Sequence, residues 1–105
     1  MRLATFSLDG EEHFGIAVTH PADPDDWLVV PEEAETFLLT EGIASERCLG
    51  GQPWPDDLIS FLEMGEAGFT AARCLLDRLA EPIAASEGTI LLDVGYSVKD
   101  VVLEA

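Results

Sequence analysis

The stretch FLEMGEAGFTAARCLLDRLA, Phe61 to Ala80, decides the helical part of the fold. It has helix-forming residues at both ends but carries Gly65 and Gly68 near its middle. In one unbroken helix the apolar Ile59 would lie on the same side as the charged Glu66, seven positions later. A glycine at position 65 can adopt the backbone conformation that ends one helix and lets the next begin. We therefore predict two consecutive helices with a break at Gly65.

The second of these helices is amphipathic. Its polar face carries Glu66, Thr70, Arg73 and Asp77, and its apolar face comprises Gly68, Ala72, Leu75, Leu76 and Leu79. Gly68 lies at the centre of the apolar face, where the missing side chain lets another backbone approach closely. The preceding helix is expected to direct Leu58, Phe61 and Leu62 at the same core, and Pro82 is expected to end the second helix.

The first part of the chain has the pattern of a β-hairpin. Apolar and polar residues alternate from Leu3 to Leu8 and again from Phe14 to Val18. Asp9-Gly10 lies between the two runs and is a turn signal, with Gly10 as the structural residue. A loop at 20–26, which contains two prolines, precedes a short apolar strand at 27–30.

Turn and helix signals divide the rest of the chain. Pro31 and the acidic residues after it favour a short helix at 32–39. The glycines and prolines of 42–55 predict a loop. Residues 89–92 and 98–103 read as two further strands around a turn at Gly95.

This order of elements predicts a single α+β domain over residues 1–105. We expect a small, mostly antiparallel sheet with an N-terminal β-hairpin, covered on one face by two to three helices.

Charge limits the classes of function. Asp and Glu number 21 against five Lys and Arg, and the net charge is −16. Such a surface repels nucleic-acid phosphates. No apolar run approaches the roughly 20 residues of a membrane-spanning helix, and no signal peptide is recognised, so we expect a soluble, cytoplasmic protein. The acidity has three competing explanations: a solubilising surface, adaptation to a salty cytoplasm, or a face for a basic partner. The presence of a single lysine, Lys99, favours salt adaptation over a partner-binding face.

Three segments at this spacing resemble the N-terminal domain of the fumarylacetoacetate hydrolase superfamily: the opening MRLATFSLDGEEHFGIAV, the central FLEMGEAGFTAARCLLDRLA and the closing SVKDVVLEA. In that family a Leu-Ala-Thr-Phe-like strand, a Gly turn and a Gly-Val-like strand open the chain. A Gly-Glu-Ala within a helical pair and a Val-x-Leu strand are also usual. The resemblance spans most of the chain and rests on strand and helix patterns rather than on catalytic signatures.

The resemblance implies an accessory domain that flanks a catalytic mouth and helps to fix subunit packing. Family members carry a larger catalytic domain after this one, with carboxylates that bind magnesium or manganese and a His-Glu pair that activates water. The chain stops at Glu104-Ala105, about where the family's connection to that domain begins. No catalytic, cofactor-binding or metal-binding residue of the family has a position here, so the chain by itself is expected to be no enzyme.

The sequence departs from the family pattern in the segment from His20 to Trp54, which looks longer and more acidic than usual. Expected partners are the catalytic domain of a family protein or a second copy of the chain, as in a dimer. A free-standing acidic protein that holds a basic protein partner is the alternative. An enzyme with a pocket assembled across a dimer is the third hypothesis.

Acidic clusters invite a metal or acid-base interpretation. His20 with Asp23, Asp25 and Asp26 is the richest set of potential ligands, but an EF-hand loop from Asp23 would need Gly and Glu where Leu28 and Ala34 stand. A solvated turn is therefore the favoured interpretation. The carboxylate pairs Glu11-Glu12, Glu32-Glu33 and Asp56-Asp57 are assigned to helix starts, turns and solvated surface, because adjacent acids arise by composition in so acidic a chain.

The two cysteines, Cys48 and Cys74, lie far apart in the sequence and form no CxxC motif. Free thiols are the expectation for such a pair. Cys74 lies at the margin of the apolar helix face and is assigned to packing. Cys48 precedes Gly50-Gly51 in the loop and is expected to be the more exposed and more reactive thiol.

Trp54 lies between Pro53 and Pro55 and is the candidate interface residue. A rigid Pro-Trp-Pro segment can present the indole to a partner, since Trp anchors are common at interface centres. The indole can equally pack under the helix that follows.

Overall fold

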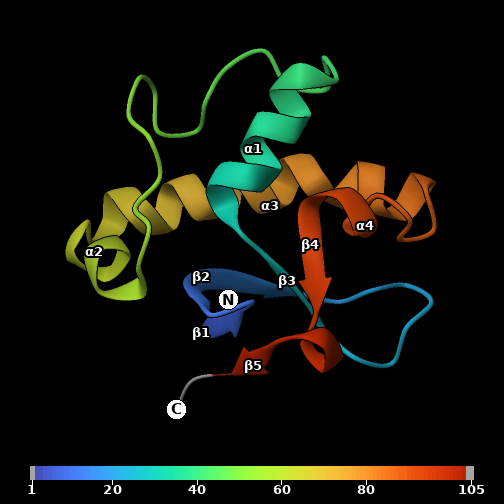
Figure 1. Ribbon diagram of the computed structural model, residues 1–105. Helices are drawn as coiled ribbons and strands as arrows, with labels where there is room; N and C mark the ends of the chain where they lie inside the picture. The colour runs from blue at the N-terminus through green and yellow to red at the C-terminus, as the bar shows by residue number, and fades with distance from the viewer. Residues whose placement is uncertain (1, 104–105) are drawn as a thin grey trace.

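The computed structural model describes residues 2–103 and has an α+β fold (Figure 1). Its elements in chain order are β1 (Leu3–Leu8), β2 (Glu11–Val18), β3 (Trp27–Val29), α1 (Pro31–Thr40), α2 (Leu58–Glu63), α3 (Glu66–Ala85), α4 (Leu91–Val94), β4 (Gly95–Ser97), the 3-10 turn η1 (Val98–Asp100) and β5 (Val102–Leu103). The strands form one antiparallel sheet in the order β4-β3-β2-β1-β5. The predicted fold class is confirmed.

The N-terminal hairpin forms as predicted. Leu8 pairs with Glu11, so the turn contains only Asp9 and Gly10. Both have positive φ, 53° and 83°. That is the geometry of a two-residue type I′ turn, whose twist matches the flanking strands.

The helices lie on one side of the sheet, with the long α3 running across it and α1 above α3 (Figure 1). One core fills the space between the two layers. The sheet contributes Phe14, Ile16 and Val29 to this core, and α3 contributes Ala72, Leu75 and Leu79. The core therefore uses the alternation of β2 and the helical periodicity of α3 that the sequence shows.

The helical pair breaks at Gly65, as predicted. α2 ends at Glu63, and Gly65 has φ 62° and ψ −138° immediately before α3 begins. Gly68 is buried, and a Cβ there would lie 3.1 Å from the Phe61 carbonyl oxygen. The missing side chain thus lets α3 approach the backbone of α2.

Two details of the helical pair differ from the prediction. Leu62 is half exposed instead of facing the core, because the six-residue α2 turns only Phe61 fully inward. Pro82 does not end α3, which continues to Ala85. A proline this close to a helix end removes one amide donor and leaves the last turn otherwise intact, as the bond from Ser86 N to the Pro82 carbonyl shows.

The C-terminal part is the least well predicted. Residues 89–92 are not a strand, since Leu91–Val94 forms the short helix α4 and Gly95 opens β4 rather than a turn. A short apolar run cannot be assigned to strand or buried helix by periodicity. Of the strand predicted at 98–103, only Val102–Leu103 pairs with β1. No helix within the described residues is long and apolar enough to cross a membrane.

Candidate functional site

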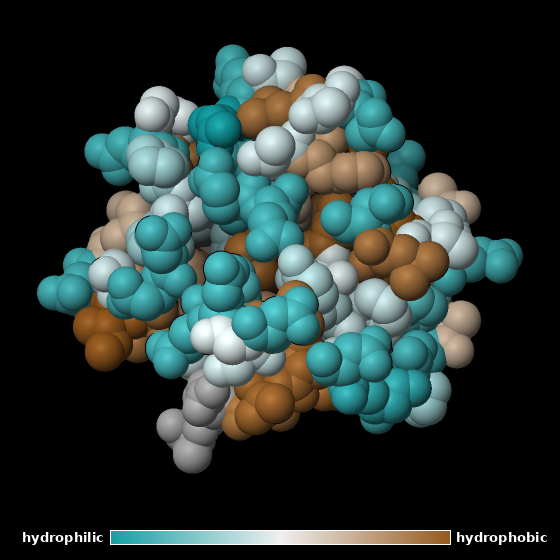
Figure 2. Space-filling view, viewed as in Figure 1, coloured by the Kyte–Doolittle hydropathy of each residue, from teal (hydrophilic) through white to brown (hydrophobic). Residues whose placement is uncertain are grey.

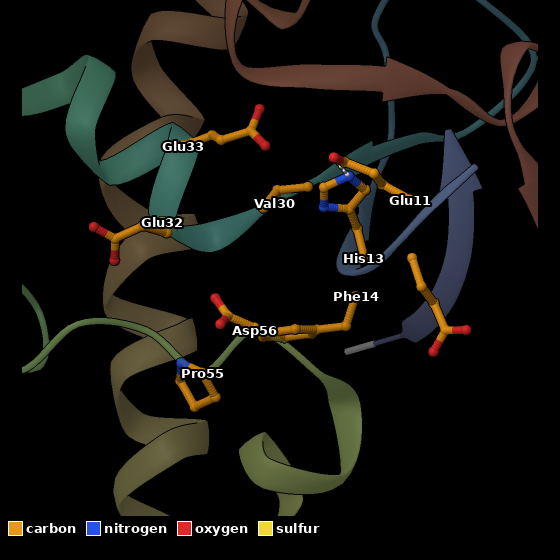
Figure 3. A pocket seen from close by; sticks show the side chains of 9 residues that line it. Glu11, His13, Phe14, Val30, Glu32, Glu33, Pro55 and Asp56 are labelled. Carbon is orange, nitrogen blue, oxygen red and sulfur yellow. Dashed lines mark ion pairs between the residues drawn. The ribbon is translucent and has the colours of Figure 1, made fainter. Parts of the chain in front are cut away.

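An acidic groove of about 510 Å³ lies where β2, the start of α1 and the segment before α2 meet (Figure 3). Its lining residues are Glu11, Glu12, His13, Phe14, Val30, Glu32, Glu33, Pro55 and Asp56. The sequence assigned the three carboxylate pairs to helix starts, turns and solvated surface. Each pair nevertheless contributes at least one residue to the lining of this groove. Only Asp57 of these six acids is absent from the lining, because it caps α2 by accepting a hydrogen bond from Ser60 N at 2.8 Å.

The two groove carboxylates of α1 point in different directions (Figure 3). Glu33 Oε1 accepts a hydrogen bond from the Tyr96 hydroxyl at 2.7 Å. Burial, together with this carboxylate, raises the pKa of Tyr96 to about 12. Tyr96 therefore remains a protonated donor at neutral pH and fixes Glu33 on the side of the sheet.

Glu32 faces the long loop instead. Its Oε2 accepts a hydrogen bond from Trp54 N at 3.0 Å, and its Oε1 accepts one from Arg47 Nη1 at 3.0 Å. Burial acts to raise the pKa of Glu32, but the hydrogen bonds from Trp54 and Arg47 outweigh burial, and the pKa is lowered from its ordinary value of 4.5. Glu32 is thus an ionised anchor for the loop.

Glu35, one turn further along α1, holds the same loop from inside the protein. Its side chain is fully buried. Oε1 accepts a hydrogen bond from Arg47 Nη1 at 3.2 Å, and Oε2 accepts one from Cys48 N at 2.8 Å. Arg47 therefore bridges Glu32 and Glu35. These contacts attach the segment 41–57 to two carboxylates of α1.

Trp54 takes the second of its two expected placements. Its side chain is 3% exposed, and its ring stacks on Phe61 with centroids 6.5 Å apart. An indole this little exposed does not stand out from the surface of this structure as an anchor. The indole Nε1 is buried and finds no hydrogen-bond partner among residues 2–103.

The loop at 20–26 is ordered by its own donors and acceptors. Asp23 accepts hydrogen bonds from Asp25 N at 2.9 Å and from the Trp27 indole at 3.2 Å. These two bonds lower the pKa of Asp23. Lys99 Nζ lies 3.4 Å from Asp25. The geometry is that of a capped turn, and no group of three or more His, Cys, Asp and Glu side chains within the described part of the chain is arranged to hold a metal ion.

The structure brings Cys48 and Cys74 together, with their sulfur atoms 2.7 Å apart. Both thiols are half-buried, and Cys48 packs against the core. Burial and the neighbouring Cys74 raise the pKa of Cys48 to about 12. The expectation that Cys48 is the exposed, reactive thiol is therefore wrong, and no sequence signal marks this pair, since 26 positions separate its members.

The groove offers hydrogen-bond acceptors and negative charge. His13 Nε2 lies 3.8 Å from Glu11, and the imidazole packs on the Phe6 ring. This arrangement suits a ligand that brings positive charge and donors. No family model, curated protein or solved structure matches this chain.

Proposed function

We propose that this chain is a non-catalytic accessory domain, resembling the N-terminal domain of fumarylacetoacetate hydrolase proteins, that packs against a catalytic domain or a second subunit. The proposal rests on exposed apolar side chains of β5 and α2, the two elements that lie next to β1. The segments that suggest the resemblance form a tight hairpin, a helical pair broken at Gly65 and a closing strand, β5, that returns to β1.

Apolar side chains are exposed on two neighbours of β1. Val102 and Leu103 on β5 are 66% and 54% exposed. Ile59 and Leu62 on α2 are 71% and 48% exposed. Figure 2 shows hydrophobic surface over both elements, at the bottom of the view for β5 and at the left for α2.

Partner binding would remove this surface from water. Full burial of one such side chain stabilises a complex by about 1.5–3 kcal/mol before the costs of association. β5 is also an edge strand of the sheet, and an edge offers backbone donors and acceptors to a partner.

Solution mass measured by light scattering tests the proposal. The chain is measured over a range of concentrations, by itself and mixed with a fumarylacetoacetate hydrolase-type catalytic domain produced from the same genome. We expect a dimer or a one-to-one complex, and Leu103→Glu should weaken it because a charge would then be desolvated at the interface. Leu92→Glu is the matched control, since Leu92 is 72% exposed on α4. The proposal is contradicted if the chain stays monomeric at every concentration and does not bind the catalytic domain.

The acidic groove supports a second candidate, a free-standing acidic protein that binds a basic protein partner. A cationic segment would meet carboxylates from β2, α1 and the segment before α2 at once. Titration calorimetry with a lysine-rich peptide should show binding that weakens as salt is added.

A charge-matched comparison separates groove binding from general attraction to an acidic protein. The variant Glu11→Gln/Glu12→Gln/Asp56→Asn removes three exposed groove charges, and Glu63→Gln/Asp77→Asn/Glu81→Gln removes three exposed charges from α2 and α3. Equal weakening in both variants contradicts a groove site.

A further inference from the structure

The two cysteines of this chain come from different elements and meet at the side of the core. Cys48 lies in the loop between α1 and α2, and Cys74 lies on α3. The Cys48 thiol donates a hydrogen bond to Cys74 Sγ at 2.7 Å. Both thiols are free and partly accessible. Their sulfur atoms are thus adjacent without being covalently joined.

The surroundings hold Cys48 at this position. Its backbone N–H is bonded to the buried Glu35, at 2.8 Å. Arg78, one turn after Cys74 on α3, donates a hydrogen bond to the carbonyl oxygen of Glu46. The loop is therefore attached to α1 and to α3 on either side of the thiol, and the approach of the two sulfurs is a consequence of the fold.

We propose that Cys48 and Cys74 form a reversible intramolecular disulfide that fastens the loop between α1 and α2 to α3. The oxidant is a low-molecular-weight disulfide. One protein sulfur attacks a reagent sulfur, a mixed disulfide forms, and one reagent thiolate leaves. The second protein sulfur then attacks the first, the second reagent thiolate leaves, and the two thiol protons end on the two released thiols. Two electrons pass from the protein to the reagent.

Either sulfur can make the first attack, because both thiols are partly accessible and lie side by side. The thiolate is the attacking species, and once one sulfur carries the mixed disulfide the other lies beside it and resolves it.

The bond would change the mobility of a wall of the groove. The fastened loop continues to Pro55 and Asp56, which line the groove. A disulfide that closes a loop of this length restricts the unfolded chain, and for a domain of this size the melting temperature is expected to rise by about 10 °C.

Oxidised glutathione is the probe. After incubation and removal of the reagent, we expect the intact mass to fall by two hydrogen atoms, both thiols to disappear in a thiol titration under denaturing conditions, and the melting temperature to rise. A dithiol reductant should reverse all three changes. A protein that stays reduced, carries glutathione on both cysteines, or forms only disulfide-linked dimers overturns the proposal.

Single-serine variants give the matched controls. Cys48→Ser should retain a stable glutathione adduct at Cys74 and show no comparable rise in melting temperature. Cys74→Ser should likewise retain a glutathione adduct, at Cys48, and show no comparable rise in melting temperature. The mass and thiol measurements on the wild-type protein still test the proposal if a variant fails to fold. If oxidation raises the melting temperature of a variant as much as that of the wild type, the stabilisation does not come from the Cys48–Cys74 bond.

Discussion

The buried carboxylate of Glu35 lies 3.2 Å from the guanidinium of Arg47, twelve residues further along the chain. Glu35 is fully buried, whereas the Arg47 side chain is one-third exposed. The same carboxylate also accepts the backbone N–H of Cys48. Glu35 therefore holds the loop between α1 and α2 at two consecutive residues, Arg47 and Cys48.

Replacing Glu35 should loosen this loop. Glu35→Ala leaves the Cys48 N–H without its acceptor, which costs about 1–3 kcal/mol of unfolding free energy. Glu35→Gln keeps an acceptor of similar shape and should cost less than Glu35→Ala. Urea unfolding of both variants, with the exposed Thr36→Ala as control, measures the difference. Equal stability of Glu35→Ala and wild type would show that the loop does not depend on this carboxylate.

Acid should weaken the anchor at Glu32. Because the pKa of Glu32 is lower in the folded protein than its ordinary 4.5, its contribution to stability is complete above that value and is lost as pH falls through the folded-state pKa. Glu32→Gln should flatten this acid loss, which thermal unfolding between neutral and acidic pH records. Asp23, whose pKa is also lowered, supplies a remaining slope in the same direction. An unchanged pH profile in Glu32→Gln contradicts the assignment.

Tyr96 should titrate at unusually high pH. Its pKa is raised to about 12, so its contribution to stability is present below the ordinary value of 10 and is lost as pH rises towards 12. The chain has a single tyrosine, so tyrosinate absorbance reports this group without interference. Glu33→Gln should lower the midpoint, since it removes the negative charge beside the hydroxyl. Circular dichroism over the same range checks that the fold persists, and a midpoint near 10 in the folded protein contradicts the partly buried, hydrogen-bonded placement of the hydroxyl.

A methyl group at Gly68 should push α2 and α3 apart. The added Cβ would lie 3.1 Å from both the Phe61 carbonyl oxygen and Met64 Cβ. Gly68→Ala gains helix propensity, but the overpacking costs more, and we expect a net loss of about 1–2 kcal/mol in chemical unfolding. At the exposed Gly51 an added Cβ meets nothing within 4 Å, so Gly51→Ala is the control. A Gly68→Ala variant that is more stable than the wild type would show that α2 and α3 leave space for the added methyl group.

Trp54 should emit as a buried indole. Trp27→Phe leaves Trp54 as the remaining tryptophan of the two in the chain. Because Trp54 is 3% exposed, fluorescence of this variant should be blue-shifted and poorly quenched by iodide. Trp27 is also buried, at 9%, so its conservative replacement by Phe keeps most of its packing. Emission at the wavelength of free tryptophan would contradict the inward placement of Trp54.

Local signals were sufficient for the elements that depend on neighbours in the sequence. The Asp9-Gly10 turn and the alternation around it predicted the hairpin, because turn type and strand pleat are set within a few residues. The break at Gly65 followed from the conflict between Ile59 and Glu66 on one helix. The assignment failed around Leu91, where a run of three apolar residues, 90–92, fits a strand and a helical turn equally well.

The candidate groove could be predicted only in its parts. The sequence shows Glu11-Glu12, Glu32-Glu33 and Asp56-Asp57 as separate acidic pairs, each with an adequate local explanation. Their convergence depends on how β2, α1 and the segment before α2 are packed. That packing follows from burial of Phe14, Ala34 and Phe61 in a common core.

The sequence by itself determined the α+β class, the hairpin, the helical pair and the strongly acidic surface, since each follows from local periodicity, turn chemistry or composition. The tertiary structure alone decided that Trp54 is buried, that Glu32 and Glu35 hold one loop, and that Cys48 lies beside Cys74. These contacts join positions 12 to 26 residues apart through an irregular segment. The path of such a segment is set by its hydrogen bonds and packing partners rather than by any repeating pattern.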